Sequence, residues 1–172
     1  MSKRKTSKKA KEQKPTNALV ASKLYKALDD CYKPHYEKGL SALKAVDKGR
    51  LSIPDGIVVA SIDVDKTMKD AEPNSNRWDY LIEYRDSVYA IEVHPCTEGE
   101  VQKIIKKAEW IRQWINRQPE LKNIVYKADT AVCFWVSSNT TTISQLSPKA
   151  RILASKKIIL CGRIWNFNKH VG

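Results

Sequence analysis

Apolar residues recur at intervals of three and four along parts of the chain, which is the spacing of an amphipathic helix. The clearest case follows Thr97, which forms with Glu100 the Thr-x-x-Glu spacing of a capping box and so predicts the start of a helix. One face of this helix is apolar and contains Val101, Ile104, Ile105, Ala108, Ile111 and Ile115. The opposite face carries Lys103, Lys106, Lys107, Gln113 and Arg117. Pro119 lies just beyond the expected end of the helix.

Three shorter helices are expected elsewhere. Asn17 is the expected cap of the first, whose apolar positions are Leu19, Val20, Leu24 and Leu28, and Pro34 should break or restart it. A second stripe is formed by Tyr36, Leu40, Leu43 and Val46, and Lys48-Gly49 predicts its end. Ser147-Pro148 opens a third short helix.

Five runs have the composition of strands, namely 57–62, 78–84, 88–94, 131–136 and 157–161. The polar stretch 65–77 between the first two predicts a mobile loop. The second and third runs are separated by a short polar segment, which favours an antiparallel hairpin, and Pro95 should end the third. The resulting order α-β-β-β-α-β-α-β predicts a single α/β domain with a mixed central β-sheet flanked by helices.

The composition excludes several classes of protein. A chain of 172 residues has room for one domain, and 6 Gly and 14 aromatic residues (2 Phe, 5 Trp and 7 Tyr) are atypical of collagen, coiled coils or full disorder. The apolar runs are far shorter than the ~18 residues of a membrane span, so we expect no membrane partner and no secretory signal. The four cysteines form no CxxC pair, and we expect them to be buried thiols in a reducing cytosol.

The formal net charge of +12 is concentrated at the N-terminus. Residues 1–14 contain one acidic residue, Glu12, and seven basic ones: Lys3, Arg4, Lys5, Lys8, Lys9, Lys11 and Lys14. Because this segment has almost nothing apolar to bury, we expect residues 1–16 to be a disordered basic tail and residues 17–172 to form the domain. Such a tail favours nucleic acid as a partner, although it is also typical of a solubilising tail or a nuclear-import signal.

The sequence has no glycine-rich phosphate loop, no GxSxG and no HExxH motif, but acidic residues gather around three neighbouring strands. Asp63 and Asp65 follow the first of these strands, Asp79 lies in the second and Glu92 in the third. A two-residue hairpin turn would place Asp79 opposite Glu92, with their Cβ atoms about 5 Å apart and room for one divalent cation. A three-residue turn would instead oppose Asp79 to Val93. Alternatively, both carboxylates could point to solvent on an exposed strand face, where no metal ion is needed to compensate their charges.

This pattern resembles the PD-(D/E)xK nuclease-like (restriction-endonuclease-like) superfamily over roughly residues 35–137. Asp79 matches the motif Asp, Glu92-Val93-His94 lies where Glu-x-Lys is expected, and the helix after Thr97 matches the helix that follows the motif. The resemblance implies an α-β-β-β-α-β core and hydrolysis of nucleic-acid phosphodiesters. It also implies Mg²⁺ or Mn²⁺ held by Asp79, Glu92 and the carbonyl of Val93, with Glu37 in the region of an additional metal-binding Glu.

The chain departs from the family pattern at His94, which stands where the family has the lysine that helps to activate the attacking water. His94 is a candidate base or water-orienting group, since imidazole titrates near neutral pH. In some family members the lysine has moved to the following helix, where Lys103 and Lys107 are the candidates. Both lysines are also expected to bind nucleic-acid phosphates.

Two functions are therefore carried forward. The first is a metal-dependent nuclease with Asp79, Glu92 and His94 as catalytic residues. The second is a non-catalytic nucleic-acid-binding or complex-assembly subunit with a degenerate site, which would belong to a larger protein or ribonucleoprotein complex. In this function Trp110 and Trp165 would be exposed aromatic residues that stack on bases or pack against a partner. A ribosomal or RNA-associated protein is a third interpretation, based on the tail and the pI of about 9.5. The expected location is the cytoplasm, at the nucleoid in a bacterium, or the nucleus in a eukaryote.

Overall fold

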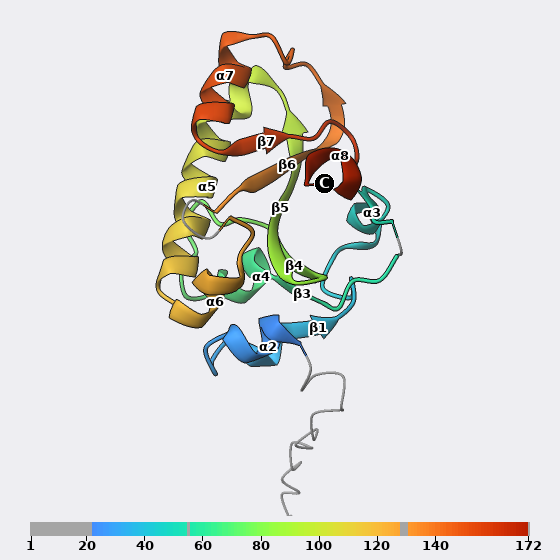
Figure 1. Ribbon diagram of the computed structural model, residues 1–172. Coiled ribbons are helices and arrows are strands. Elements are labelled where there is room, and N and C mark those ends of the chain that lie inside the picture. Colours follow the sequence, from blue (N-terminus) through green and yellow to red (C-terminus); the bar gives the residue numbers. More distant parts are fainter. Residues whose placement is uncertain (1–21, 55, 128–130, 172) are drawn as a thin grey trace, which may run out of the picture.

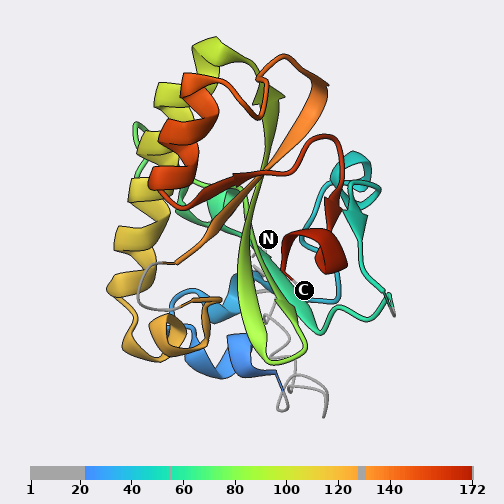
Figure 2. The same ribbon diagram turned by 45° about the horizontal axis from the view of Figure 1, so that its top comes forward.

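The computed structural model describes residues 22–54, 56–127 and 131–171. These residues form a mixed six-stranded sheet with helices on both faces and a separate parallel pair of two short strands, β2 and β8 (Figures 1 and 2). The strands are β1 (Tyr36–Lys38), β2 (Leu51–Ser52), β3 (Ala60–Asp63), β4 (Tyr80–Tyr84), β5 (Ser87–Cys96), β6 (Cys133–Thr141), β7 (Ile158–Leu160) and β8 (Trp165–Asn166). The helices are α2 (Lys23–Ala27), α3 (Ala45–Lys48), α4 (Val64–Met68), α5 (Val101–Asn116), α6 (Pro119–Ile124), α7 (Pro148–Ser155) and α8 (Phe167–His170). Two short 3-10 turns cover Lys33–His35 and Glu98–Glu100.

The sheet order is β1-β3-β4-β5-β6-β7. Its first four strands are antiparallel neighbours, whereas β5, β6 and β7 are parallel to one another. Parallel neighbours need a crossover connection, and helices α5 and α6 join β5 to β6 while α7 joins β6 to β7. The mixed α/β sheet flanked by helices that the sequence predicts is confirmed.

Helices α5 and α7 lie along one face of the sheet, and α3 and α8 lie on the other (Figures 1 and 2). The first face has the larger apolar core, to which α5 contributes all six of its predicted apolar positions. The core of the second face is rich in aromatic rings, including those of Tyr84, Tyr89, Phe134 and Trp165. Strand β6 is buried on both faces from Cys133 to Val136, as the lack of alternation in this run predicts.

The N-terminal part of the domain differs from the expectation. Helix α2 begins at Lys23 and is capped by Ser22, while Asn17, Leu19, Val20 and the basic tail lie outside the described residues. The predicted helix from Tyr36 to Lys48 is wrong except for its last turn. Tyr36 pairs with Ile62 in an edge strand, and the chain turns at Gly39, whose φ is +55°. The backbone leaves the helical conformation there, which separates the two halves of the apolar stripe.

A buried carboxylate attaches α2 to the sheet. Glu83 of β4 accepts hydrogen bonds from the Ser22 hydroxyl at 2.5 Å and from the backbone N–H groups of Lys23 and Leu24 at 2.9 and 3.0 Å. These three hydrogen bonds compensate the free-energy cost of burying the Glu83 carboxylate away from water. The position of α2 is thus set by a residue about sixty positions further along the chain.

Several other boundaries also differ. The first predicted strand begins only at Ala60, and Ile57 is exposed. The expected loop after Asp65 starts as helix α4, because the Asp63 side chain accepts a hydrogen bond from the Lys66 N–H and caps it. The third strand continues through Pro95 to Cys96 with an irregular register, which is where a proline can be accommodated.

The prediction of a capping box at Thr97 is wrong, because the Thr97 side chain makes no capping hydrogen bond. Helix α5 begins at Val101, after a 3-10 turn. Cys31 is exposed, whereas the other three cysteines are buried as expected. Trp165 is fully buried rather than exposed. None of the helices in the described ranges has the length and apolar content needed to span a bilayer.

Candidate functional site

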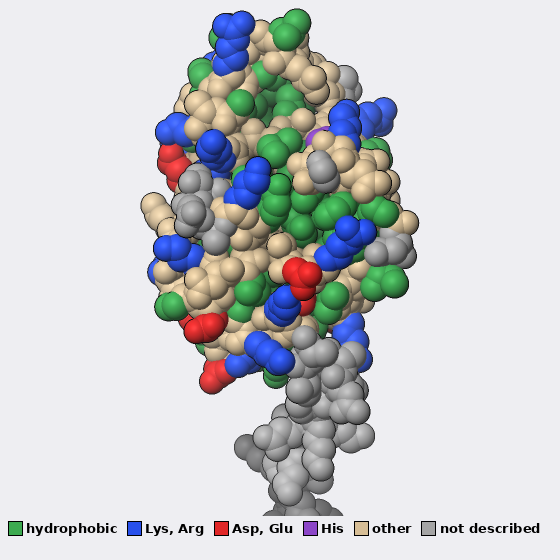
Figure 3. Space-filling model, viewed as in Figure 1, with side chains coloured by type: hydrophobic (Ala, Val, Ile, Leu, Met, Phe, Trp, Pro, Cys, Tyr) green, Lys and Arg blue, Asp and Glu red, His purple; other side chains and the backbone are tan. Residues whose placement is uncertain are grey.

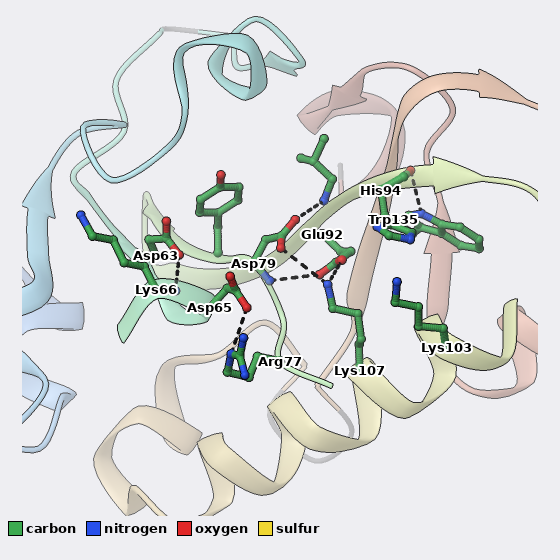
Figure 4. Close-up of polar contacts among 12 residues, drawn as sticks. Asp63, Asp65, Lys66, Arg77, Asp79, Glu92, His94, Lys103, Lys107 and Trp135 are labelled. Carbon is green, nitrogen blue, oxygen red and sulfur yellow. Dashed lines mark hydrogen bonds and ion pairs between the residues drawn. The ribbon is translucent and has the colours of Figure 1, made fainter. Parts of the chain in front are cut away.

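The β4–β5 hairpin sets the two predicted acidic residues against each other. Tyr84 pairs with Ser87 and Tyr80 pairs with Ile91, so the turn has two residues, and the same register places Asp79 opposite Glu92. The backbone N–H of Asp79 donates to Glu92 Oε2 at 3.0 Å, and the N–H of Val93 donates to Asp79 Oδ2 at 3.0 Å. The structure thus brings together the two carboxylates that the sequence analysis proposed (Figure 4).

A third charged group completes this cluster. Helix α5 directs Lys107 toward the strands, where its ammonium donates to Glu92 Oε1 and lies 3.6 Å from Asp79 Oδ1 (Figure 4). Lys107 is 8 % exposed, so its predicted position on the outer face of α5 is wrong. It lies three residues after Ile104 and four before Ile111, at the margin of the buried face. Of the two candidate replacements for the family lysine, Lys107 is the one that contacts the carboxylates.

Burial dominates the electrostatics of the site. Glu92 is completely buried, which raises its pKa, and the Asp79 carboxylate adds to that rise while the Lys107 ammonium opposes it. Burial likewise raises the pKa of Asp79, against Lys107 and the Val93 N–H. For Lys107, burial acts to lower the pKa, but the two carboxylates outweigh it and the pKa is raised. Lys107 is therefore a charged hydrogen-bond donor at neutral pH and not a base.

Within the described part of the chain, His94 forms no hydrogen bond or ion pair with Asp79, Glu92 or Lys107. Its Nε2 lies 2.6 Å from Glu100 Oε2, and Glu100 is also 3.7 Å from the Lys103 ammonium. The His94 carbonyl accepts from the indole N–H of Trp135 at 3.1 Å. Through Glu100, His94 and Lys103 form a second polar group. Figure 4 shows both side chains beside the carboxylate cluster.

The remaining predicted acids are engaged differently. Asp63 caps α4, and Asp65 forms an ion pair of 3.0 Å with Arg77. Burial raises the pKa of Asp63, and the charges of Asp65 and Asp79 raise it further. Glu37 is exposed on the edge strand β1 and not on a helix. These acids border the site without joining the pair formed by Asp79 and Glu92.

Trp110 is fixed at the side of α5 rather than free to stack on a base. Its indole N–H donates to Glu72 Oε2 at 2.6 Å, and Glu72 also accepts from Ser75 and forms an ion pair with Arg117. Arg77, which pairs with Asp65, donates to the Glu72 carbonyl. Glu72 therefore fastens the segment between α4 and β4 to α5, next to the site.

The donor set suits a hard divalent cation with an incomplete protein shell. Among the described residues, no group of three or more His, Cys, Asp and Glu side chains is arranged to hold a metal ion. Mg²⁺, however, is commonly bound by one or two carboxylates, with water and substrate phosphates completing its coordination. Asp79 and Glu92 are two neighbouring carboxylates of that kind.

Comparisons of the chain with protein-family profiles, with curated proteins and with solved structures found no match.

Proposed function

We propose that this protein is a metal-dependent nuclease, or a nuclease-like protein, that acts on nucleic-acid phosphodiesters. The observation that supports this most directly is the cluster of Asp79, Glu92 and Lys107, in which a half-buried carboxylate just before β4, a fully buried carboxylate on β5 and an ammonium on α5 converge. Two acids and a lysine are the residue types of the PD-(D/E)xK motif, and the lysine comes from the helix, as it does in some members. The restriction-endonuclease-like fold is part of the same proposal.

Each residue has a role that its surroundings support. Asp79, Glu92 and the Val93 carbonyl would hold Mg²⁺ or Mn²⁺. The chemistry supplied by such an ion is polarisation of the phosphodiester and a lowered pKa for a bound water. Lys107, charged and directed at the carboxylates, would donate to the attacking water or to a phosphate oxygen and so stabilise developing negative charge.

His94 is a second group that could orient or deprotonate the attacking water. The Glu100 carboxylate holds its Nε2, which is how a positioned imidazole is commonly oriented. Lys103 next to it, and the seven cations of the N-terminal tail, would neutralise neighbouring phosphates. The tail itself lies outside the described residues.

One observation favours the alternative, a nucleic-acid-binding or assembly subunit without catalysis. Both oxygens of Glu92 and one of Asp79 already accept hydrogen bonds from the protein, and the Lys107 ammonium compensates their charge. A site that is satisfied in this way has no need of a metal ion for stability. The two functions therefore differ in their response to metal.

The first test is the melting temperature of the protein with and without millimolar Mg²⁺ or Mn²⁺. An ion at ten times its dissociation constant stabilises by about 1.4 kcal/mol, which raises the melting temperature of a domain of this size by about 4 °C. Asp79→Asn should abolish the rise. Asp86→Asn, at an exposed carboxylate in the same hairpin, is the matched control and should retain it.

The second test is cleavage of plasmid DNA and of single-stranded RNA with added metal and with EDTA. The nuclease proposal expects cleavage that EDTA stops and that Lys107→Met reduces more than His94→Gln does. The opposite ranking would make His94 the water-activating residue. A melting temperature indifferent to metal, together with no cleavage, would exclude the nuclease and leave the binding function.

A further inference from the structure

Three residues other than glycine have a positive φ in the described part of the chain, and all three are basic. Arg85, Lys127 and Lys157 have φ values of 53°, 54° and 56°. In this left-handed region a side chain crowds its own backbone, and glycine or asparagine is the favoured residue. All three side chains are exposed, and none forms an ion pair with another described residue.

These three residues lie at one edge of the sheet, which we call the basic edge. Arg85 is in the turn before β5, and Lys157 immediately precedes β7. Lys127 precedes β6 and is held beside the start of β5, because the N–H of Tyr126 donates to the Val88 carbonyl at 2.8 Å. Since β5, β6 and β7 are parallel, their starts all lie at the same edge.

A row of aromatic rings connects two of these cations. The Arg85 guanidinium lies over the rings of Tyr84 and Phe167, at 5.2 Å from each centroid. The Lys127 ammonium lies 5.3 Å from the centroid of Tyr126. The rings between them are in contact, since Phe167 is 5.8 Å and Tyr126 is 5.3 Å from Tyr89. Cation–π contacts with these rings therefore favour the observed positions of Arg85 and Lys127, and Figure 3 shows Lys and Arg side chains around the apolar area of this face.

Stability of the fold gives each of the three cations only a small reason, since the contacts of Arg85 and Lys127 are cation–π contacts at exposed positions. Lys157 follows the C-terminus of α7, where a positive charge is favoured by the helix dipole. Helices prefer glycine or asparagine at that position, because its backbone is left-handed. The conformational cost of a lysine there therefore opposes the favourable interaction of its charge with the helix dipole. Arg85 lies in a hairpin turn, where no helix dipole acts on it. Among the described residues, the acidic neighbour of Arg85 in the turn, Asp86, is paired with Lys23 at 2.7 Å.

We infer that the basic edge binds the phosphate backbone of nucleic acid. At Arg85 the basic edge lies away from the candidate active site, because Glu92 is five residues beyond Ser87 along β5, which corresponds to about 17 Å. At Lys157 it is nearer, since Leu160, three residues further along β7, is level with Glu92 through Trp135. Nucleic acid that reaches the site can extend to this edge and contact both. The inference shares a nucleic-acid ligand with the proposed function, but it requires neither a metal nor hydrolysis.

The test compares the affinity of full-length wild type and of Arg85→Asn/Lys127→Asn/Lys157→Asn for a labelled mixed-sequence DNA duplex, in EDTA, over a range of salt concentrations. Loss of three phosphate contacts lowers the log–log salt slope by about 2.7, and affinity at 0.1 M salt by on the order of 10²-fold. The melting temperature should not fall, because asparagine is better suited than lysine or arginine to the left-handed backbone. The corresponding triple glutamine variant removes the same charges without changing the backbone preference and should bind equally weakly.

The matched control is Lys26→Asn/Lys38→Asn/Lys48→Asn, which removes three exposed lysines elsewhere with the same change in net charge. It should retain nearly the wild-type slope, and an equal loss in the control would show that only net charge matters and would overturn the inference. Unchanged binding in both edge variants, or tight binding of anionic vesicles in place of DNA, would also overturn it. Because EDTA is present throughout, these results are independent of metal-dependent cleavage.

Discussion

Replacing Lys107 with methionine removes the ammonium that contacts both carboxylates of the cluster while keeping the length of the side chain. Glu92 is completely buried and Asp79 is 19 % exposed in its side chain, so their negative charges would have little water to compensate the loss. Breaking a buried ion pair by removing one partner costs about 3–5 kcal/mol. For a domain of this size the melting temperature should fall by about 10 °C.

A double-mutant cycle separates this charge effect from lost packing. In Lys107→Met/Glu92→Gln both charges are removed, and the Gln side-chain oxygen can still accept from the Asp79 N–H. The double variant should therefore recover more than half of the stability that Lys107→Met loses. Unfolding in urea, followed by circular dichroism at pH 7 without metal, measures the four free energies of the cycle.

Lys106→Met is the control for position and side-chain type, because Lys106 is the exposed neighbour on the same helix, and its effect should stay within about 0.5 kcal/mol. Mg²⁺ should stabilise Lys107→Met more than it stabilises wild type, since the ammonium no longer repels the ion. If Lys107→Met unfolds at the same urea concentration as wild type, the electrostatic account of the cluster is incorrect.

Two further predictions concern residues outside the site. Glu83→Gln should lower the free energy of unfolding by about 2 kcal/mol, because one of the three hydrogen bonds to the buried carboxylate loses its acceptor. The control Asp86→Asn, in the exposed turn, should change the free energy of unfolding by under about 0.5 kcal/mol, and equal effects of the two variants in urea unfolding would contradict this prediction. His170 accepts a hydrogen bond from the Asn166 N–H at 3.0 Å through Nδ1, and burial lowers its pKa below the usual 6.5. Since the unfolded chain binds that proton more readily, stability that is present above pH 6.5 should decline as the pH falls through the lowered pKa, and His170→Gln should show a smaller decline between pH 7.5 and 5.

The sequence predicts the elements that have strong local patterns. The apolar face of α5 and the Ser147 cap of α7 follow from residue spacing, and so does the hairpin of β4 and β5. The sequence allowed a turn of two or of three residues in that hairpin, and only the observed register, with two residues, opposes Asp79 to Glu92. The helix expected at Tyr36 is wrong because a stripe of four apolar residues fits more than one backbone, and pairing with β3 decides between them.

The identity of the third charged residue in the cluster depends on tertiary structure. Lys103, Lys106 and Lys107 are chemically alike and lie within two turns of α5, so local spacing alone does not select one of them. The choice depends on the rotation of the helix against β5, which the apolar residues around Lys107 fix. A signal is nevertheless present, because Lys107 lies between Ile104 and Ala108 at the margin of the apolar stripe.

The attachment of α2 to Glu83 has a consequence for the order in which the chain folds. A helix of five residues is too short to persist alone in water, and the acceptor for its first N–H groups lies about sixty residues downstream. Helix α2 can therefore become stable only after β3, β4 and β5 have paired, so its docking is a late event of high contact order. On a ribosome, a nascent chain that ends before Glu83 has no acceptor for Ser22, so α2 cannot dock until β4 has been synthesised.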